Sequence, residues 1–99
     1  MALDSKQAKQ LRSLAHHLNP VINIGRSDIT EAVVRQTEQA LEAHELIKCS
    51  VQEGSNLTVS EAAEQLAEQT NAEVVQVIGR KFVLYRESSR DDIEKIELA

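Results

Sequence analysis

The sequence is poor in residues that staple, bend or stack a polypeptide chain. Its 99 residues include one cysteine, one proline, three glycines, two aromatic residues and no tryptophan. A single thiol cannot form an internal disulfide, which fits a reducing compartment. The two aromatics, Phe82 and Tyr85, would project from opposite faces of a strand. A pair of stacking aromatics on one face, as in RNA-recognition-motif proteins, is therefore excluded.

Long apolar runs are also missing. Residues 1–18 contain no apolar stretch of the kind found in signal peptides, and no segment is long enough to cross a bilayer. We therefore expect a cytoplasmic protein without a membrane partner. A chain of this length forms one domain, which buries roughly 65% of the unfolded surface.

Groups of side chains that could catalyse a reaction or hold a metal are absent too. His16 and His17 are neighbours on an expected helix, so their side chains point apart. His44 and Cys49 could meet, but two ligands do not make a zinc site. Residues 25–27 lack the second glycine of a hydrolase nucleophile elbow. We expect no enzymatic activity, no metal, no cofactor and no small-molecule substrate.

Positive charge is scarce and unevenly distributed. The chain has 11 Lys and Arg against 16 Asp and Glu, a net charge of −5. Residues 5–26 contain Lys6, Lys9, Arg12 and Arg26 with no acid, whereas residues 52–73 contain five acids and no base. A basic front and an acidic back indicate contact with a nucleic acid.

Hydrophobic periodicity predicts seven elements. We expect helices at 5–18, 29–44 and 58–71, and strands at 21–24, 46–51, 73–78 and 81–86. The order α-β-α-β-α-β-β implies right-handed parallel crossovers followed by one antiparallel strand. The prediction is a single α/β domain with a four-stranded mixed sheet over residues 1–87, followed by a flexible acidic tail at 88–99.

Local signals predict the connections between these elements. Asp28 with Glu31, and Thr58 with Glu61, have the spacing of a capping box at a helix start. Gly79 at the first turn position favours a type II′ hairpin between the last two strands. That turn predicts three cross-strand pairs, which are Val77 with Phe82, Val75 with Leu84, and Glu73 with Arg86.

Two features could hold phosphate. The first helix repeats cationic and polar residues at helical spacing on its outer face: Lys6, Lys9, Arg12, Ser13 and His16. The loop at 25–28 lies before a helix N-terminus, where free N–H groups favour anions. There Gly25 allows close approach of the backbone and Arg26 supplies a charged fork. Taken singly, a solvated helix surface and a plain strand-to-helix turn explain them better than phosphate binding does.

Several strings together resemble one known family. Residues 15–20 read Ala-His-His-Leu-Asn-Pro, residues 24–26 read Ile-Gly-Arg, residues 44–48 read His-Glu-Leu-Ile-Lys, and residues 79–86 match Gly-Arg-x-x-Val-Leu-Tyr-Arg. The chain resembles the CRM domain (chloroplast RNA splicing and ribosome maturation) in its stand-alone bacterial YhbY-like form.

The resemblance implies a fold similar to the C-terminal domain of translation initiation factor three. It also implies RNA binding through a Gly-x-x-Gly loop and nearby basic residues. Bacterial members imply association with precursors of the large ribosomal subunit, and organellar relatives serve intron splicing. Asp28 stands where the family loop usually has its second glycine. As a cap of the second helix, it would compete with phosphate for the same N–H groups.

We therefore expect a non-catalytic RNA-binding protein that assists ribosome assembly and contacts structured ribosomal RNA mainly through phosphates. The candidate RNA-binding residues are Lys6, Lys9, Arg12, His16, Gly25, Arg26, Ser27, Lys48, Arg80 and Lys81. The motif also contains Arg86, which the expected pair with Glu73 makes structural. The alternative is a protein-interaction module whose acidic third helix and tail dock a basic partner, such as a ribosomal protein.

Overall fold

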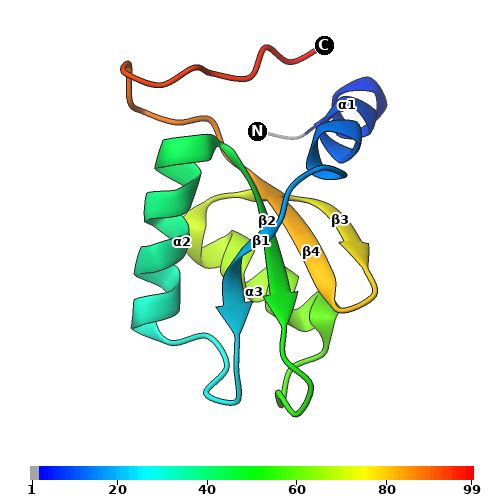
Figure 1. Ribbon diagram of the computed structural model, residues 1–99, viewed down its shortest axis with the longest axis vertical. Helices are drawn as coiled ribbons and strands as arrows, with labels where there is room; N and C mark the ends of the chain where they lie inside the picture. Colours follow the sequence, from blue (N-terminus) through cyan, green and yellow to red (C-terminus); the bar gives the residue numbers. More distant parts are fainter. Residues whose placement is uncertain (1–2) are drawn as a thin grey trace.

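Four strands form one sheet, and the three helices divide between its two faces (Figure 1). The computed structural model describes residues 3–99. The elements are α1 (Ser5–Ala15), β1 (Pro20–Ile24), α2 (Glu31–His44), β2 (Leu46–Val51), α3 (Val59–Thr70), β3 (Glu73–Ile78) and β4 (Lys81–Tyr85). This order confirms the predicted α/β class. Among the described helices, none combines the length and the apolar character needed to cross a membrane.

The strand order in the sheet is β1-β2-β4-β3. β1 runs parallel to β2, and β4 runs antiparallel to both of its neighbours, β2 and β3. The predicted mixed sheet is therefore confirmed. Its two edges are β1 and β3, while β2 and β4 are central.

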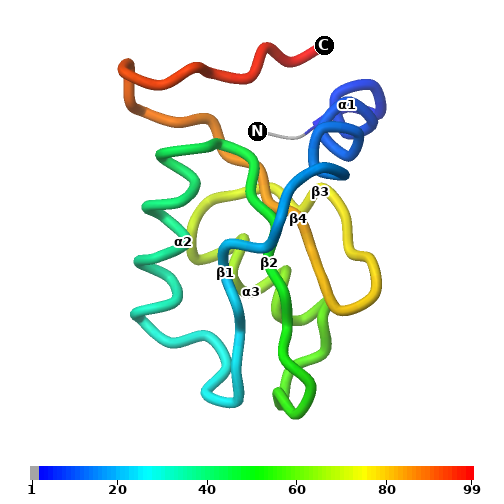
Figure 2. The backbone as a smooth tube through the Cα atoms, in the orientation of Figure 1, coloured from blue at the N-terminus to red at the C-terminus, as the bar shows by residue number. Residues whose placement is uncertain are grey.

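Alternation of side chains along the strands builds two cores, one on each face of the sheet. α2 and α3 pack on one face, around Ile22, Leu66 and Phe82. α1 covers part of the other face, where Leu11 packs with Tyr85 and other buried residues. Successive residues of a strand point to opposite faces, so Phe82 and Tyr85 lie on opposite faces, as the sequence predicts. The tube in Figure 2 shows α1 apart from the two other helices.

The helix starts agree with the capping signals in one predicted case and not in the other. The Thr58 side chain accepts from the N–H of Glu61, whose carboxylate accepts from the N–H of Thr58, which completes the predicted capping box of α3. The prediction that Asp28 caps α2 is wrong. Thr30 caps that helix, since its hydroxyl accepts from the Val33 N–H at 3.2 Å.

The hairpin of β3 and β4 begins in the predicted register and then shifts. Val77 lies opposite Phe82, as predicted, but an irregularity between Val74 and Gln76 displaces the rest. Leu84 therefore faces Val74, and Tyr85 faces Glu73, so the predicted pairs Val75–Leu84 and Glu73–Arg86 are wrong. The extra residue of the bulge lets Val75 turn to the α1 side, where it is buried.

Arg86, expected to pair with Glu73, binds α2 and α3 instead. Its guanidinium lies 3.2 Å from the carboxylate of Glu42 and donates to the backbone oxygen of Thr70 at 2.8 Å. These contacts tie the end of β4 to both helices of the larger core. Arg86 is therefore a structural residue.

The acidic segment at 88–99 runs from the end of α2 across to α1 (Figure 1). The fully buried carboxylate of Glu45 accepts from the backbone N–H groups of Ser88 and Ile96, both at 2.7 Å. Gln10 of α1 donates to the Glu97 oxygen and accepts from the Ala99 N–H. The division into a domain at 1–87 and a flexible tail at 88–99 stays a prediction.

Candidate nucleic-acid interface

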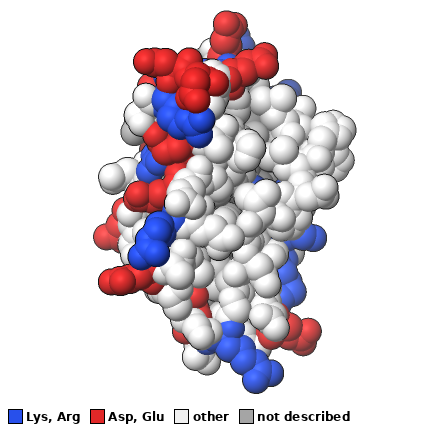
Figure 3. Space-filling model, turned by 60° about the vertical axis from the view of Figure 1, so that its left-hand side comes forward, with Lys and Arg blue, Asp and Glu red and all other residues white. Residues whose placement is uncertain are grey.

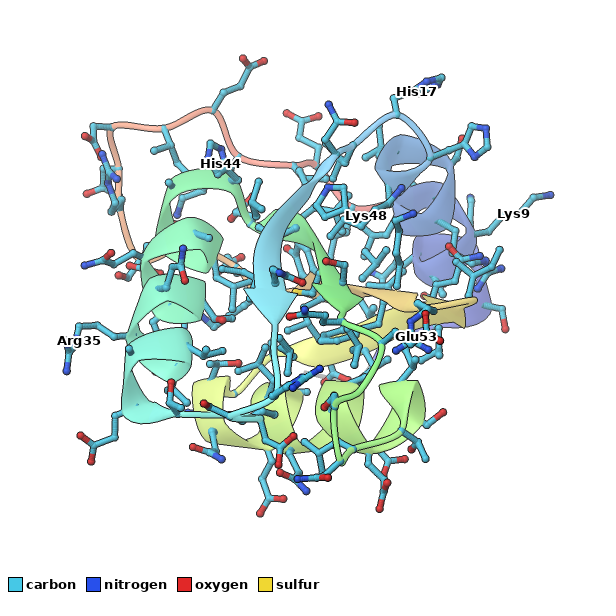
Figure 4. The ribbon with its side chains drawn as sticks, turned by 60° about the horizontal axis from the view of Figure 1, so that its bottom comes forward. Lys9, His17, Arg35, His44, Lys48 and Glu53 are labelled. Carbon is cyan, nitrogen blue, oxygen red and sulfur yellow. The ribbon has the colours of Figure 1, made fainter. Side chains whose placement is uncertain are left out.

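The outer face of α1 exposes the cationic side chains that the sequence singles out. Lys6, Lys9, Arg12 and His16 are exposed, while Leu11 is fully buried against the sheet. Figure 4 shows Lys9 pointing away from the body of the protein. Within residues 3–99, none of these cations is in an ion pair. Their charges are therefore available to a ligand.

The sheet face that α1 leaves uncovered is polar and carries two further candidates. Asn23, Ser50 and Lys81 lie side by side on adjacent strands, and the Ser50 hydroxyl donates to the Asn23 side-chain oxygen at 3.1 Å. Lys48, two residues before Ser50 on β2, lies on the same face. In the view of Figure 4, Lys48 lies between β1 and α1. The open face thus adds two cations to those of α1.

The glycine loop at 25–28 forms a tight turn, and hydrogen bonds join it to a second turn, which follows β2 and contains Gly54. The N–H of Asp28 donates to the oxygen of Gly25 at 3.1 Å. The Asp28 carboxylate accepts from the Ser55 hydroxyl at 2.9 Å and from the Asn56 N–H at 3.2 Å. Asp28 therefore does not compete with a ligand for the N–H groups of α2, contrary to the prediction. Two residues separate it from the helix, and its carboxylate faces the other turn.

Glycine usually occupies this position in the family that the sequence resembles, and the backbone conformation of Asp28 explains that preference. Its φ is 58°, in the left-handed region. Glycine adopts that region without a steric cost, and aspartate tolerates it better than most other residues. The fourth loop position therefore demands a conformation that Asp28 supplies while it also binds the second turn.

Two arginines lie where these turns meet the sheet. A Cβ on Gly54 would lie 3.6 Å from Nε of Arg26, so the Arg26 side chain runs along the second turn. Nε of Arg80 donates to the Val51 oxygen at 3.1 Å, which places Arg80 at the end of β2. Since β1 and β2 are parallel, their following loops emerge at one edge of the sheet. That rule could have assigned the Gly54 turn to the site from the sequence.

The basic helix and the glycine loop lie at opposite ends of β1 (Figure 1). Lys48 and Lys81 lie on the open sheet face between these ends. Arg80 contacts Val51, and Lys48 lies three residues before Val51 on β2. At about 3.3 Å per residue, Lys48 is therefore roughly 10 Å along the strand from the Arg80 contact. The candidates therefore form an extended track rather than one compact pocket. The cations of this track are Lys6, Lys9, Arg12, Arg26, Lys48, Arg80 and Lys81.

The remaining cations lie elsewhere and are partly neutralised. Seven of the 11 Lys and Arg residues belong to the track, and the other four are Arg35, Arg86, Arg90 and Lys95. Arg86 pairs with Glu42 and Arg90 with Asp92. Figure 3 shows acidic and basic side chains interleaved on the face that carries α2 and the tail. That face has no excess of positive charge.

Neither thiol nor imidazole chemistry is assembled in the described part of the chain. His44 is exposed, while Cys49 is buried in the larger core, where desolvation raises the pKa of its thiol to about 12. Within residues 3–99, no cluster of three or more His, Cys, Asp or Glu side chains could hold a metal ion. The polar groups of the track are donors suited to an anion.

Comparison with known families and proteins identifies the family to which this chain belongs. The family of CRS1 / YhbY (CRM) domains matches residues 3–86. The chain belongs to this CRM domain family. A Bacillus subtilis relative, named as the probable RNA-binding protein YqeI, is 40% identical over 97% of this chain and 98% of its own length. An RNA-binding protein of Haemophilus influenzae is 41% identical over 93% of each chain.

A solved structure supports the same family and the same fold. The solution structure of a Staphylococcus aureus protein, described as a candidate for RNA binding, has a TM-score of 0.77 and 43% identity to this CRM domain. The similarity covers 96% of this chain and all of the other. The relatives are named as RNA-binding proteins rather than as enzymes. This CRM domain thus belongs to a family of RNA-binding domains and not to an enzyme family.

Proposed function

We propose that this CRM domain binds structured RNA, mainly through the phosphates, along the track from α1 to the two glycine turns. The observation that carries the proposal is the segregation of charge. Seven cations without ion pairs within residues 3–99 line this track, although the protein carries a net charge of −5. Lys and Arg contacts to phosphates supply most of the affinity in non-specific nucleic-acid binding. The names of its relatives support the same partner.

Each part of the track has a distinct role in the proposed complex. The lysines of α1 act as mobile point charges, whereas Arg26 and Arg80 offer planar forks suited to phosphate oxygens. Gly25 lets the backbone approach, and Ser27 adds a hydroxyl to the exposed part of the loop. His16, at the end of α1, adds an exposed imidazole as a further hydrogen-bond donor.

We further propose that the RNA is ribosomal, from precursors of the large subunit, and that binding assists ribosome assembly in the cytoplasm. The resemblance of the sequence motifs to bacterial YhbY-like proteins supports this choice. A domain that recognises structured RNA through phosphates reads shape more than sequence, which suits a folded ribosomal precursor. Ribosomal proteins would be neighbours in such a complex.

Salt dependence tests the phosphate contacts. The logarithm of RNA affinity should fall linearly with the logarithm of salt concentration, and loss of one phosphate-contacting cation should lower that slope by about one unit. The triple variant Lys9→Ala/Arg12→Ala/Arg26→Ala should bind more weakly and with a lower slope than the parent. The matched control is Arg35→Ala/Lys95→Ala, which removes cations outside the track. Parent-like affinity and slope in the triple variant would refute the site.

The identity of the RNA is tested separately. Crosslinking in growing cells, followed by sequencing of the bound RNA, should recover large-subunit ribosomal sequences, including unprocessed ends. The triple variant should lose these crosslinks, while the control variant keeps them. Recovery of messenger or transfer RNA alone would contradict the ribosomal role but leave the phosphate track intact.

A further inference from the structure

A hollow of about 370 Å³ lies between α3 and the edge strand β3, on the sheet face opposite to α1. It contains none of the candidate RNA-binding residues. The residues that line it are Ser60, Ala63, Glu64, Ala67, Ala72, Glu73, Val74 and Val77. Its volume is near the lower end of ordinary ligand sites, which are about 300–1,000 Å³.

The local sequence explains why this hollow is left open. Ala63 and Ala67 give α3 short side chains toward β3, so they do not fill the space above the strand. The bulge in β3 sends Val75 to the α1 side and leaves Val74 and Val77 beside α3. Val74 is 37% exposed and Val77 is 42% exposed. Two valines on the edge of a sheet thus remain available to another chain.

The charge around the hollow specifies its occupant. Residues 52–79 contain no lysine, arginine or histidine. Glu61, Glu64 and Glu68 are all exposed on α3, and Glu64 lines the hollow itself. RNA would be repelled here, and so would an acidic peptide. A segment that combines positive charge with aliphatic side chains satisfies both the valines and the glutamates.

We propose that the α3–β3 hollow docks a short basic and aliphatic segment of a protein partner. Aliphatic side chains of that segment cover Val74 and Val77, and its lysines or arginines lie beside Glu64 and its acidic neighbours. Eight residues line the hollow, whereas a standard interface involves roughly 20–30 residues on each side, so the contact is weak and reversible. Because it lies on the face opposite to α1, the segment and RNA bind at the same time.

The position of the tail narrows this surface to α3 and β3. Figure 1 shows the acidic tail across the top of the protein and α3 below, behind the sheet. The tail contacts α2 and α1 through Ser88 and Glu97. A short segment in the hollow therefore binds without the tail, so the partner needs to match only one of the two acidic regions.

Synthetic peptides test the chemistry of the occupant. The probe is a capped hexapeptide of alternating Lys and Val, titrated into the isotope-labelled full chain and followed by backbone amide shifts. We expect saturable shifts in α3 and β3 and none in α1 or the loop at 25–28. A Glu/Val peptide should give no shifts, and a Lys/Ser peptide should bind about tenfold more weakly. Equal binding of all three peptides, or shifts centred on α1, would overturn the proposal.

Two substitutions test the site itself. Val77→Ser and Glu64→Lys should each weaken the Lys/Val peptide about tenfold. The matched controls are Val21→Ser, on the other edge strand, and Glu31→Lys, on α2, and both should bind like the parent. Circular dichroism confirms that every variant is folded. If Val77→Ser binds the peptide as tightly as the parent does, the site is wrong.

Two other occupants are outcomes of the same series. If the parent sediments as a dimer and Val77→Ser as a monomer, a second copy of this chain fills the hollow, and the proposal fails. Titration with a structured RNA hairpin should shift α1 and the open sheet face. Shifts in α3 and β3 instead would show that the hollow takes nucleic acid, which also refutes the proposal.

Discussion

Truncation of Glu45 should loosen the tail and cost a large part of the stability of the protein. This residue ends α2 with an unusual backbone, at φ 63°, and its side chain is fully buried. The two carboxylate oxygens accept from the backbone N–H groups of Ser88 and Ile96, each at 2.7 Å. One side chain therefore holds two points of the tail, 43 and 51 residues further along the chain.

The magnitude follows from these two contacts. A hydrogen bond to a charged group contributes about 1.5–3 kcal/mol net, so two contribute about 3–6 kcal/mol. Truncation also relieves the cost of burying the carboxylate, which offsets part of that loss. We expect Glu45→Ala to lower the free energy of unfolding by about 2–4 kcal/mol. For a domain of this size, the melting temperature would fall by roughly 10–25 °C.

Urea denaturation followed by circular dichroism measures this loss. Glu45→Gln is the more conservative test, because a neutral amide can accept from one N–H but presents its own N–H₂ group to the other. Its loss should lie between those of Glu45→Ala and the parent. The control is Glu38→Ala, an exposed side chain on the same helix. Limited proteolysis should cut residues 88–99 of Glu45→Ala faster than those of the parent. A Glu45→Ala protein within 0.5 kcal/mol of the parent would refute this reasoning about the tail.

Substitutions at three further positions probe the turns and the core. Asp28→Ala should lower stability more than Asp28→Gly, since both lose the contacts to the second turn but only alanine is strained at φ 58°; thermal melts would rank them. Gly79→Ala should cost about 1–2 kcal/mol, because φ is 59° there while nothing crowds the added Cβ; urea titration should show it, and no change would contradict the strain argument. For Cys49, the thiol pKa is raised from 9.0 to about 12, so the unfolded thiol ionises first and stability should fall as the pH rises above 9. Cys49→Ala should lose that part of the alkaline decline, and a native thiol that reacts with a maleimide at pH 8 as fast as the denatured one would disprove its burial.

The fold was largely predictable because its signals are local. Apolar periodicity marks α2 and β2, and Thr58 with Glu61 marks the start of α3 within four residues. The failures share one cause, which is a partner far away in the sequence. Asp28 has the spacing of a cap, yet its carboxylate binds Ser55 and Asn56, which lie 27 and 28 positions further along the chain. The contacts of Glu45 are equally invisible to a local pattern.

The candidate site was predictable in its residue types but not in its layout. The basic face of α1 and the loop at 25–28 follow from spacing and motif. Their separation along β1, with Lys48 and Lys81 on the open face between them, needs the strand order of the sheet. The register shift in β3 could not be predicted either, because a bulge depends on how Val75 packs beneath α1.

The link from Asp28 to Ser55 and Asn56 also bears on how fast RNA can be captured. A free glycine loop would have to lose its conformational freedom at the moment a phosphate arrives, and that ordering would slow or weaken binding. Here two turns that follow parallel strands are already joined by two hydrogen bonds at one end of the sheet. If RNA binds there as proposed, capture requires little ordering of the loop, so the association rate should depend on electrostatic steering and drop steeply with added salt. Asp28→Gly removes both hydrogen bonds, so its loop should become ordered only after contact with RNA, and association should be slower than in the parent.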